Sequence, residues 1–192
     1  MTNLIFLSGS TRKDSFNSKL SKLACAIAQN IEGVSAKFVD LKDYEMPIYN
    51  GDFEEESGLP ESAKLLKEVF KNSDGFFIAS PEYNSSFSPL LKNTLDWISR
   101  PHEKGEAPLV AFSGKVAAIA ATSPGGFGGM RGLVPLRMML ENISTIVIPK
   151  QLAISFATKE FDSEGELISE KYKVILKELV EQFADTATRI KK

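Results

Sequence analysis

The sequence predicts an α/β fold in which a parallel β-sheet is covered by helices on both faces. Three observations support this prediction. Short runs of consecutive apolar residues recur along the chain, and such runs are typical of strands buried in a parallel sheet. Between them lie segments with apolar residues three and four positions apart, which indicate amphipathic helices. A length of 192 residues with 43% hydrophobic content suits one domain over residues 1–192.

Charge and composition exclude several classes of function. The formal net charge is −2, so no excess of basic residues attracts nucleic acid or an anionic membrane. The apolar runs have strand length, and no basic segment followed by an apolar one opens the chain. We therefore expect neither a membrane-spanning helix nor a signal peptide. The expectation is a cytoplasmic protein without nucleic-acid or membrane partners.

The cysteine and histidine content limits metal and nucleophilic chemistry. Cys25 is the only cysteine, which excludes an internal disulfide, an iron–sulfur cluster and a cysteine zinc site, and its neighbours predict a buried small hydrophobe. His102 is the only histidine, so no metal site is predicted, and its charged neighbours favour a solvated loop position. A hydrolase with Ser10 or Ser123 as nucleophile would depend on His102 as its base.

The first strand and the first helix enclose an unusual loop. Leu4–Leu7 is apolar throughout, and Leu20–Ile31 has helical spacing with Ser15 as its expected N-cap. A helix N-terminus offers unpaired N–H groups and partial positive charge, to which this loop adds an arginine and small polar side chains. We therefore predict a phosphate site made of Ser10, Thr11, Arg12, Ser15 and Asn17. An ordinary turn with a serine cap is the alternative.

This loop differs from the common nucleotide-binding loops. It lacks the Gly-Lys-Ser/Thr ending of NTPases, and it lacks the G-x-G-x-x-G of dinucleotide folds. A nucleoside triphosphate or a tightly bound NAD is therefore disfavoured.

The remaining elements continue the alternation. A strand is predicted at Val34–Leu41, and the long loop Asp43–Pro60 carries apolar residues that would pack on the same subunit or on a second one. Four later helices are predicted: one at 61–71, one that begins at 89, one that ends at 141 and one at 166–190. The later strands are predicted at 75–80, 115–122 and 145–154. Five such strands fit the flavodoxin-like order 2-1-3-4-5, a three-layer sandwich. Its ligand lies beyond the carboxyl ends of strands 1, 3 and 4.

Two other loops end at that edge of the sheet. After the third strand, Pro81, Glu82, Tyr83 and Asn84 combine an aromatic ring, a carboxylate and turn-forming residues, which suit a flat heterocycle with polar edges. After the fourth strand, Ser123–Gly129 contains four glycines, which let backbone N–H groups approach a ring edge. A surface tyrosine and a flexible lead-in to a helix are the alternatives. The joint placement of three such loops favours a ligand site.

Three motifs together resemble the NADPH-dependent FMN reductase family of flavodoxin-like quinone, azo and chromate reductases. They are Gly9-Ser10-x-Arg12-x-x-Ser15-x-Asn17, Pro81-Glu82-Tyr83-Asn84 and Leu91-Lys92-Asn93-x-x-Asp96-Trp97, followed by Ser123-Pro124-Gly125-Gly126. The resemblance implies FMN, with its phosphate held by Ser10, Arg12, Ser15, Asn17 and the backbone of Phe16. It places the isoalloxazine ring along Pro81, Glu82, Tyr83 and Asn84, closed on the far side by Ser123, Pro124, Gly125 and Gly126.

The same resemblance implies an enzyme that oxidises NAD(P)H. Hydride would pass from nicotinamide C4 to flavin N5 and then, in a ping-pong mechanism, to a flavin, a quinone, an azo compound or an oxidised metal ion. No catalytic side chain is predicted, and the backbone N–H groups of 123–126 are expected to stabilise negative charge near N1 and O2. The alternative is a flavodoxin-like FMN electron carrier that does not oxidise NAD(P)H, against which Arg12 and the near-neutral charge argue.

Two further expectations concern the second nucleotide and the assembly. Glu82 or Arg100 is expected to orient NAD(P)H, whereas Lys92, Asn93 and Asp96 are expected to brace the third helix. The apolar residues within Tyr44–Phe53, together with the resemblance, predict a homodimer or homotetramer with FMN near the subunit boundary.

Overall fold

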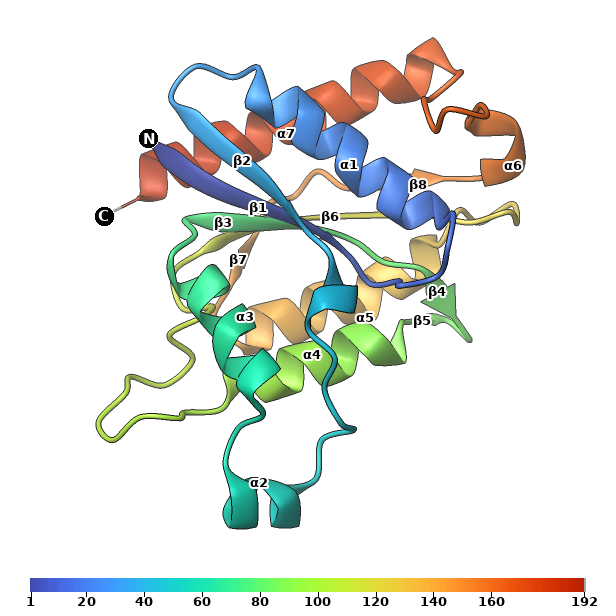
Figure 1. Cartoon of the computed structure of the whole chain (residues 1–192). Coiled ribbons are helices and arrows are strands. Elements are labelled where there is room, and N and C mark those ends of the chain that lie inside the picture. The colour runs from blue at the N-terminus through green and yellow to red at the C-terminus, as the bar shows by residue number, and fades with distance from the viewer. Residues whose placement is uncertain (192) are drawn as a thin grey trace.

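A parallel sheet lies at the centre of the molecule (Figure 1). The computed structural model describes residues 1–191, and its main strands are β1 (Thr2–Ser8), β2 (Val34–Val39), β3 (Gly75–Ala79), β6 (Val116–Thr122), β7 (Ile146–Val147) and β8 (Leu152–Ile154). Their order is β2-β1-β3-β6-β7, and β8 pairs with β6 further along its length. Every pairing in this sheet is parallel. The predicted order 2-1-3-4-5 is confirmed, with β7 and β8 sharing the fifth position.

Helices cover both faces of the sheet, as the sequence predicts (Figure 1). One face carries α1 (Phe16–Gln29) and α7 (Glu170–Ile190), and the other carries α3 (Glu61–Lys71), α4 (Pro89–Ser99) and α5 (Met130–Asn142). The shorter elements are η1 (Leu41–Asp43), α2 (Gly51–Ser57), β4 (Glu82–Tyr83), β5 (Ser86–Phe87) and α6 (Ala157–Glu160). No helix within residues 1–191 combines the length and the apolar character needed to cross a bilayer.

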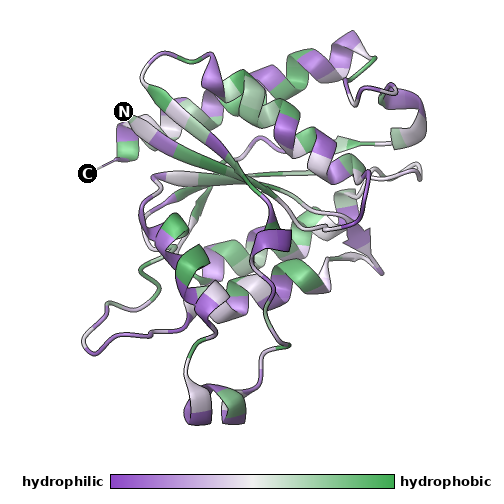
Figure 2. Cartoon of the chain, in the orientation of Figure 1, coloured by the Kyte–Doolittle hydropathy of each residue, from purple (hydrophilic) through white to green (hydrophobic). Residues whose placement is uncertain are grey.

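The alternation of side chains along the strands divides the core into two layers. Phe6 and Phe77 pack with the residues of α1 and α7, and their rings stack with 5.5 Å between centroids. Ile78 and Ile119 pack with the residues of α3, α4 and α5. Figure 2 shows hydrophobic residues gathered along the strands. Cys25 is buried in the first layer, as predicted, and burial raises the pKa of its thiol to about 11.

Two predicted elements differ from the structure for local reasons. The fifth strand, predicted within 145–154, is divided into β7 and β8 near Pro149, whose nitrogen has no hydrogen to donate to the ladder. The guanidinium of Arg137 donates to the carbonyls of Val147 at 3.3 Å and Ile148 at 3.0 Å at this interruption. The closing helix begins at residue 170, four residues later than predicted, because the chain first forms an antiparallel bridge between residues 161 and 167.

The long segment 43–60 packs on its own subunit and contains the helix α2, which the sequence analysis missed. Trp97 Nε1 donates to the carbonyl of Pro47 at 2.8 Å, and the rings of Tyr49 and Trp97 meet edge to face at 4.9 Å. Asn93 accepts a hydrogen bond from Tyr49 N at 2.7 Å, so it joins α4 to this segment. Same-subunit packing, one of the two predicted alternatives, therefore accounts for most of the apolar residues of the segment.

His102 is not the solvated histidine that the sequence predicts. Its side chain is 11% exposed and lies 3.3 Å from Lys67 Nζ and 3.5 Å from Glu106 Oε2. Lys67 is buried and forms an ion pair of 2.6 Å with Glu106. Burial opposes ionisation of Glu106, but the hydrogen bonds from Lys67 and from the His102 N–H, together with the nearby positive charge, outweigh it and lower the pKa of Glu106. These contacts hold the loop 100–114 against α3, and they leave His102 with a structural role.

Candidate functional site

The three predicted loops meet in one pocket at the carboxyl ends of β1, β3 and β6. The pocket has a volume of about 110 Å³ and is lined by Ser10, Arg12, Ser15, Phe16, Asn17, Pro81, Glu82, Tyr83, Thr122, Ser123 and Pro124. All of these except Thr122 are residues that the sequence predicts. Thr122 was missed because it belongs to no motif, and its only signal is a polar residue at the end of an apolar run.

Four predicted residues do not line this pocket. Thr11, Gly125 and Gly126 lie in its loops without contributing to the lining, and Asn84 lines a neighbouring cavity of about 540 Å³ that shares Tyr83. This second cavity lies between the β4–β5 hairpin and α5. Tyr83 therefore lies between the small pocket and a larger cavity on the α5 side of the hairpin.

The N-terminus of α1 forms the anion-binding half of the pocket. Ser15 caps the helix as predicted, because its Oγ accepts a hydrogen bond from Ser18 N at 3.3 Å. The backbone N–H groups of Phe16 and Asn17 have no acceptor within residues 1–191, and the first turn carries no acidic residue. Arg12 lines the same pocket and forms no ion pair in the described part of the chain. This donor set matches the oxygens of a phosphate group.

Two contacts fix this loop against its neighbours. The Asn17 side chain donates to the carbonyl of Thr122 and accepts from the N–H of Thr122, both at 3.0 Å. Ser88 Oγ donates to the carbonyl of Gly9 at 2.6 Å, and a Cβ at Gly9 would lie only 2.9 Å from that hydroxyl. Glycine is therefore required for this close approach. The amide of Asn17 braces the loop to β6, which is a different task from the direct phosphate contact that the sequence analysis assigned to it.

The β4–β5 hairpin forms the second wall, within a stretch that the sequence analysis treated as a loop. Its two-residue turn places Asn84 at φ 52° and Ser85 at φ 66°, and tight hairpins of this kind need positive φ at both positions. Asparagine tolerates this backbone better than most residues. The turn presents Tyr83 at the rim of the pocket with 51% of its surface exposed, so its side chain is accessible to a ligand there, and an aromatic ring suits stacking on a planar one.

The Glu82 carboxylate binds the N-terminus of α5. It accepts from Arg131 Nε at 2.8 Å, from Arg131 N at 3.0 Å and from Gly132 N at 3.4 Å. Only 7% of the Glu82 side chain is exposed. Arg100 pairs with Glu54 at 2.8 Å, where the carboxyl end of α4 meets α2. Glu82 and Arg100 were the residues expected to orient NAD(P)H. Neither is free, because both form ion pairs that position secondary structure.

The glycine loop 123–129 forms the third wall. The N–H of Ser123 donates to Ile154 O at 3.2 Å, and Pro124 has no N–H. The N–H groups of Gly125 and Gly126 have no acceptor within residues 1–191. These two groups are therefore the free donors of the segment 123–126, to which the sequence analysis assigned stabilisation of negative charge.

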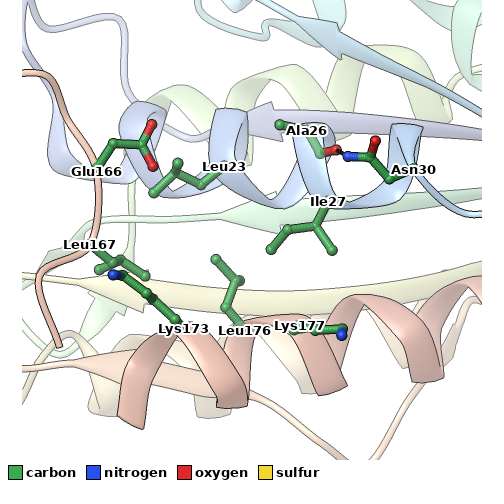
Figure 3. Close-up of a pocket in the computed structure, with 9 residues that line it drawn as sticks. All are labelled: Leu23, Ala26, Ile27, Asn30, Glu166, Leu167, Lys173, Leu176 and Lys177. Carbon is green, nitrogen blue, oxygen red and sulfur yellow. Dashed lines mark hydrogen bonds between the residues drawn. The ribbon is translucent and has the colours of Figure 1, made fainter. Parts of the chain in front are cut away.

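A separate groove lies between α1 and α7 (Figure 3). Its volume is about 390 Å³, and aliphatic side chains such as Leu23, Ile27 and Leu176 form much of its lining. The lysines at its edge are paired within α7, as in the 2.6 Å contact of Lys173 with Glu170. The groove contains none of the predicted site residues.

The chain is similar to known proteins in sequence and in fold. A family model described as NADPH-dependent FMN reductase matches residues 2–159. The chain belongs to the NADPH-dependent FMN reductase family. An NAD(P)H-dependent FMN reductase of Pseudomonas aeruginosa is 36% identical over 92% of this chain and 88% of that protein. An NADPH:quinone oxidoreductase of Arabidopsis thaliana is 34% identical over 91% of this chain and 86% of that protein.

A solved structure supports the same assignment for this FMN reductase. The flavoenzyme NAD(P)H:(acceptor) oxidoreductase from Paracoccus denitrificans superposes with a TM-score of 0.82 at 30% identity, covering 98% of each chain. The predicted family and fold are confirmed. The protein is an oxidoreductase with FMN as cofactor and NAD(P)H as co-substrate.

The residues present fit FMN. Unpaired helix N–H groups and the unpaired Arg12 suit its phosphate, the ring of Tyr83 suits its planar ring system, and the free N–H groups of Gly125 and Gly126 suit a polar ring edge. Arg131 was not predicted, because its role depends on a pairing with Glu82 across 49 residues of sequence. No local pattern reveals such a contact.

Proposed function

We propose that this FMN reductase transfers hydride from NAD(P)H to a small planar acceptor, with a quinone as the principal class, by a ping-pong mechanism. The single observation that carries this proposal is the convergence of the Arg12 loop, Tyr83 and the glycine loop on one pocket. The similarity of this chain to an NADPH:quinone oxidoreductase supports the choice of a quinone as acceptor. Flavins, azo compounds and oxidised metal ions are further acceptors within the proposal.

FMN, when bound, would supply the redox chemistry, which is the transfer of hydride from NAD(P)H to the acceptor. The protein holds and orients FMN. Ser10, Arg12 and the N-terminus of α1 bind the phosphate, and Tyr83 with Pro81 lines the ring. No side chain of the pocket is placed as a general acid or base, since the Glu82 carboxylate is already occupied by Arg131.

The proposal distinguishes an enzyme from an electron carrier, and one experiment decides between them. Purified protein loaded with FMN is mixed with NADPH or NADH under argon, and absorbance near the flavin maximum is followed. Rapid bleaching, followed by recovery of the yellow colour on addition of a benzoquinone, is expected of the enzyme. A flavin that stays yellow with both nucleotides but accepts electrons from dithionite would identify a carrier instead.

We further propose that the protein is a homo-oligomer, with a dimer as its smallest form and a tetramer as the larger alternative. Met130, Val134 and Met138 recur every four residues along α5 and are 49%, 68% and 59% exposed. They form an apolar stripe beside the cavity that Tyr83 lines, and a second copy is the occupant that this stripe fits. FMN would then lie near the subunit boundary.

Light scattering tests this assembly. Val134→Glu places a charge in the stripe and is expected to halve the mass, whereas Val174→Glu, at a 54% exposed position on α7, is the matched control that leaves the mass unchanged. A monomeric wild-type mass would refute the proposal. We also propose a cytoplasmic location, because NAD(P)H is supplied inside the cell, and cell fractionation tests it.

A further inference from the structure

The segment 155–157 lies behind the glycine loop and binds three of its carbonyl groups. Ala157 N donates to Ser123 O at 3.0 Å, and Phe156 N donates to Gly125 O at 3.2 Å. Ser155 Oγ donates to Gly126 O at 2.7 Å. The segment follows β8, the last strand of the sheet, so these contacts all come from the side of the loop that faces β8.

These contacts fix the direction of the remaining polar groups. In a trans peptide the C=O and the following N–H point in opposite directions. Because the carbonyls of Gly125 and Gly126 point toward the segment 155–157, the N–H groups of Gly126 and Phe127 point away from it. Neither N–H has an acceptor among residues 1–191. The segment therefore turns two adjacent donors to the side opposite β8.

Phe156 adopts an unfavourable backbone conformation to make these contacts. Its φ and ψ are 54° and 45°, in the left-handed region that bulky residues rarely occupy. This conformation lets two successive N–H groups, those of Phe156 and Ala157, bind carbonyls of the same loop. The ring gains little burial in return, because Phe156 is 52% exposed. Strain of this kind persists where the surrounding structure fixes it, and it is concentrated at functional sites.

We propose that Ser155 and Phe156 are positioning residues that set the redox potential of the flavin. By holding the loop carbonyls, they aim the N–H groups of Gly126 and Phe127 at the flavin edge where negative charge gathers on reduction. Preorganised donors stabilise the charged, reduced form more than the oxidised form, so they raise the midpoint potential. This inference rests on the proposed function, in which FMN lies in the pocket of Arg12 and Tyr83.

Ser155→Ala tests the role of the hydroxyl. The variant loses the bond to Gly126 O, and we expect about a tenfold loss of the preference for reduced over oxidised FMN, which for a two-electron couple is a shift of about 30 mV to more negative potential. The potential is measured by anaerobic titration against a dye of known potential. Oxidised FMN should bind with a Kd within about twofold of wild type, measured by quenching of flavin fluorescence. Ser155→Thr retains the hydroxyl and is expected to restore the potential.

Ser99→Ala is the matched control. Ser99 Oγ donates to Asp96 O at 2.6 Å near the end of α4, so its removal deletes a similar hydrogen bond without touching the glycine loop. Its midpoint potential is expected to equal that of wild type. An equal shift in Ser99→Ala and Ser155→Ala would overturn the inference.

Two substitutions of Phe156 separate its backbone from its ring. Phe156→Pro removes the N–H and forbids the left-handed conformation, and we expect the same negative shift as in Ser155→Ala or a larger one. Phe156→Gly removes the ring but adopts positive φ readily, and its potential is expected to stay within measurement error of wild type. An equal shift in both variants would overturn the backbone role. Ser155→Ala carries the test where Phe156→Pro fails to fold.

The outcomes also separate this inference from the proposed function. A wild-type protein whose flavin is not bleached by NAD(P)H refutes the enzyme, and one that binds no FMN refutes both. A wild-type protein that binds FMN and is bleached, together with unshifted potentials in Ser155→Ala and Phe156→Pro, refutes the positioning role alone.

Discussion

Arg12 offers the sharpest test of the phosphate site. The residue is exposed and has no ion pair within residues 1–191, so its guanidinium loses no protein partner when an anion binds. A hydrogen bond to a charged group is worth about 1–3 kcal/mol. Solvent screening at an exposed position reduces this, but the ligand carries nearly two negative charges. We expect Arg12→Ala to weaken FMN binding by about 2 kcal/mol, or roughly 30-fold.

The assay compares FMN with riboflavin, which has the same ring system and no phosphate. Apoprotein is titrated into each flavin, and the quenching of flavin fluorescence gives the two dissociation constants. Arg12→Ala should lose affinity for FMN and keep its affinity for riboflavin, because only the phosphate contact is removed. Raising the salt concentration should weaken FMN binding to wild type more than to the variant.

A matched control distinguishes a local contact from a general effect of charge. Arg189→Ala removes an arginine of α7 that pairs with Asp185 at 2.8 Å, and its FMN affinity should equal that of wild type. Equal losses for FMN and riboflavin in Arg12→Ala would show that the substitution disturbs the fold of the loop. Unchanged FMN affinity would place the phosphate elsewhere.

Three further predictions concern stability. Asn17→Ala leaves the N–H and C=O of Thr122 unpaired in a buried position, so urea unfolding should show a loss of about 2–4 kcal/mol. The pKa of Glu106 is lowered from 4.5 in the folded state, so its contribution to stability is complete above that value and is lost as the pH falls through the folded pKa. Acid titrations should therefore show a weaker pH dependence of stability in Glu106→Gln than in wild type below pH 4.5. Gly129→Ala should cost about 1–3 kcal/mol, because φ is 85° and the new Cβ would lie 2.6 Å from Ala121 Cβ, whereas Gly105→Ala, with φ 83° and no atom within 4 Å, should lose only the part due to backbone strain.

The sheet order could be predicted because the central strands β1, β3 and β6 contain uninterrupted apolar runs. Such runs identify central strands directly, and the right-handed crossover rule then restricts the topology. The errors fall where a long-range contact decides local structure. Pro149 interrupts the fifth strand with the help of Arg137, and the burial of His102 depends on Lys67, which precedes it by 35 residues.

The residues that line the pocket were largely predictable, whereas the role of each residue was not. Helix N-terminus, arginine and glycine signals are local, so the sequence locates the three loops that line the pocket. Whether a polar side chain faces a ligand or the protein depends on its partner. Asn17 and Glu82 were assigned to ligands, but their partners Thr122 and Arg131 come from other loops.

The use of these polar side chains as braces explains the simplicity of the site. Asn17 joins the first loop to the third, and Glu82 joins the second to the helix that follows the third. The groups that remain free are the Arg12 guanidinium, a tyrosine ring and backbone N–H groups, and none of them is a carboxylate or an imidazole. A cofactor that supplies its own redox chemistry needs orientation and fixed dipoles more than a titrating side chain. Because no acidic or basic side chain of the site is placed to exchange a proton with the acceptor, we expect the rate of acceptor reduction to follow the redox potential of the acceptor. We also expect this rate to depend little on pH between about 6 and 8.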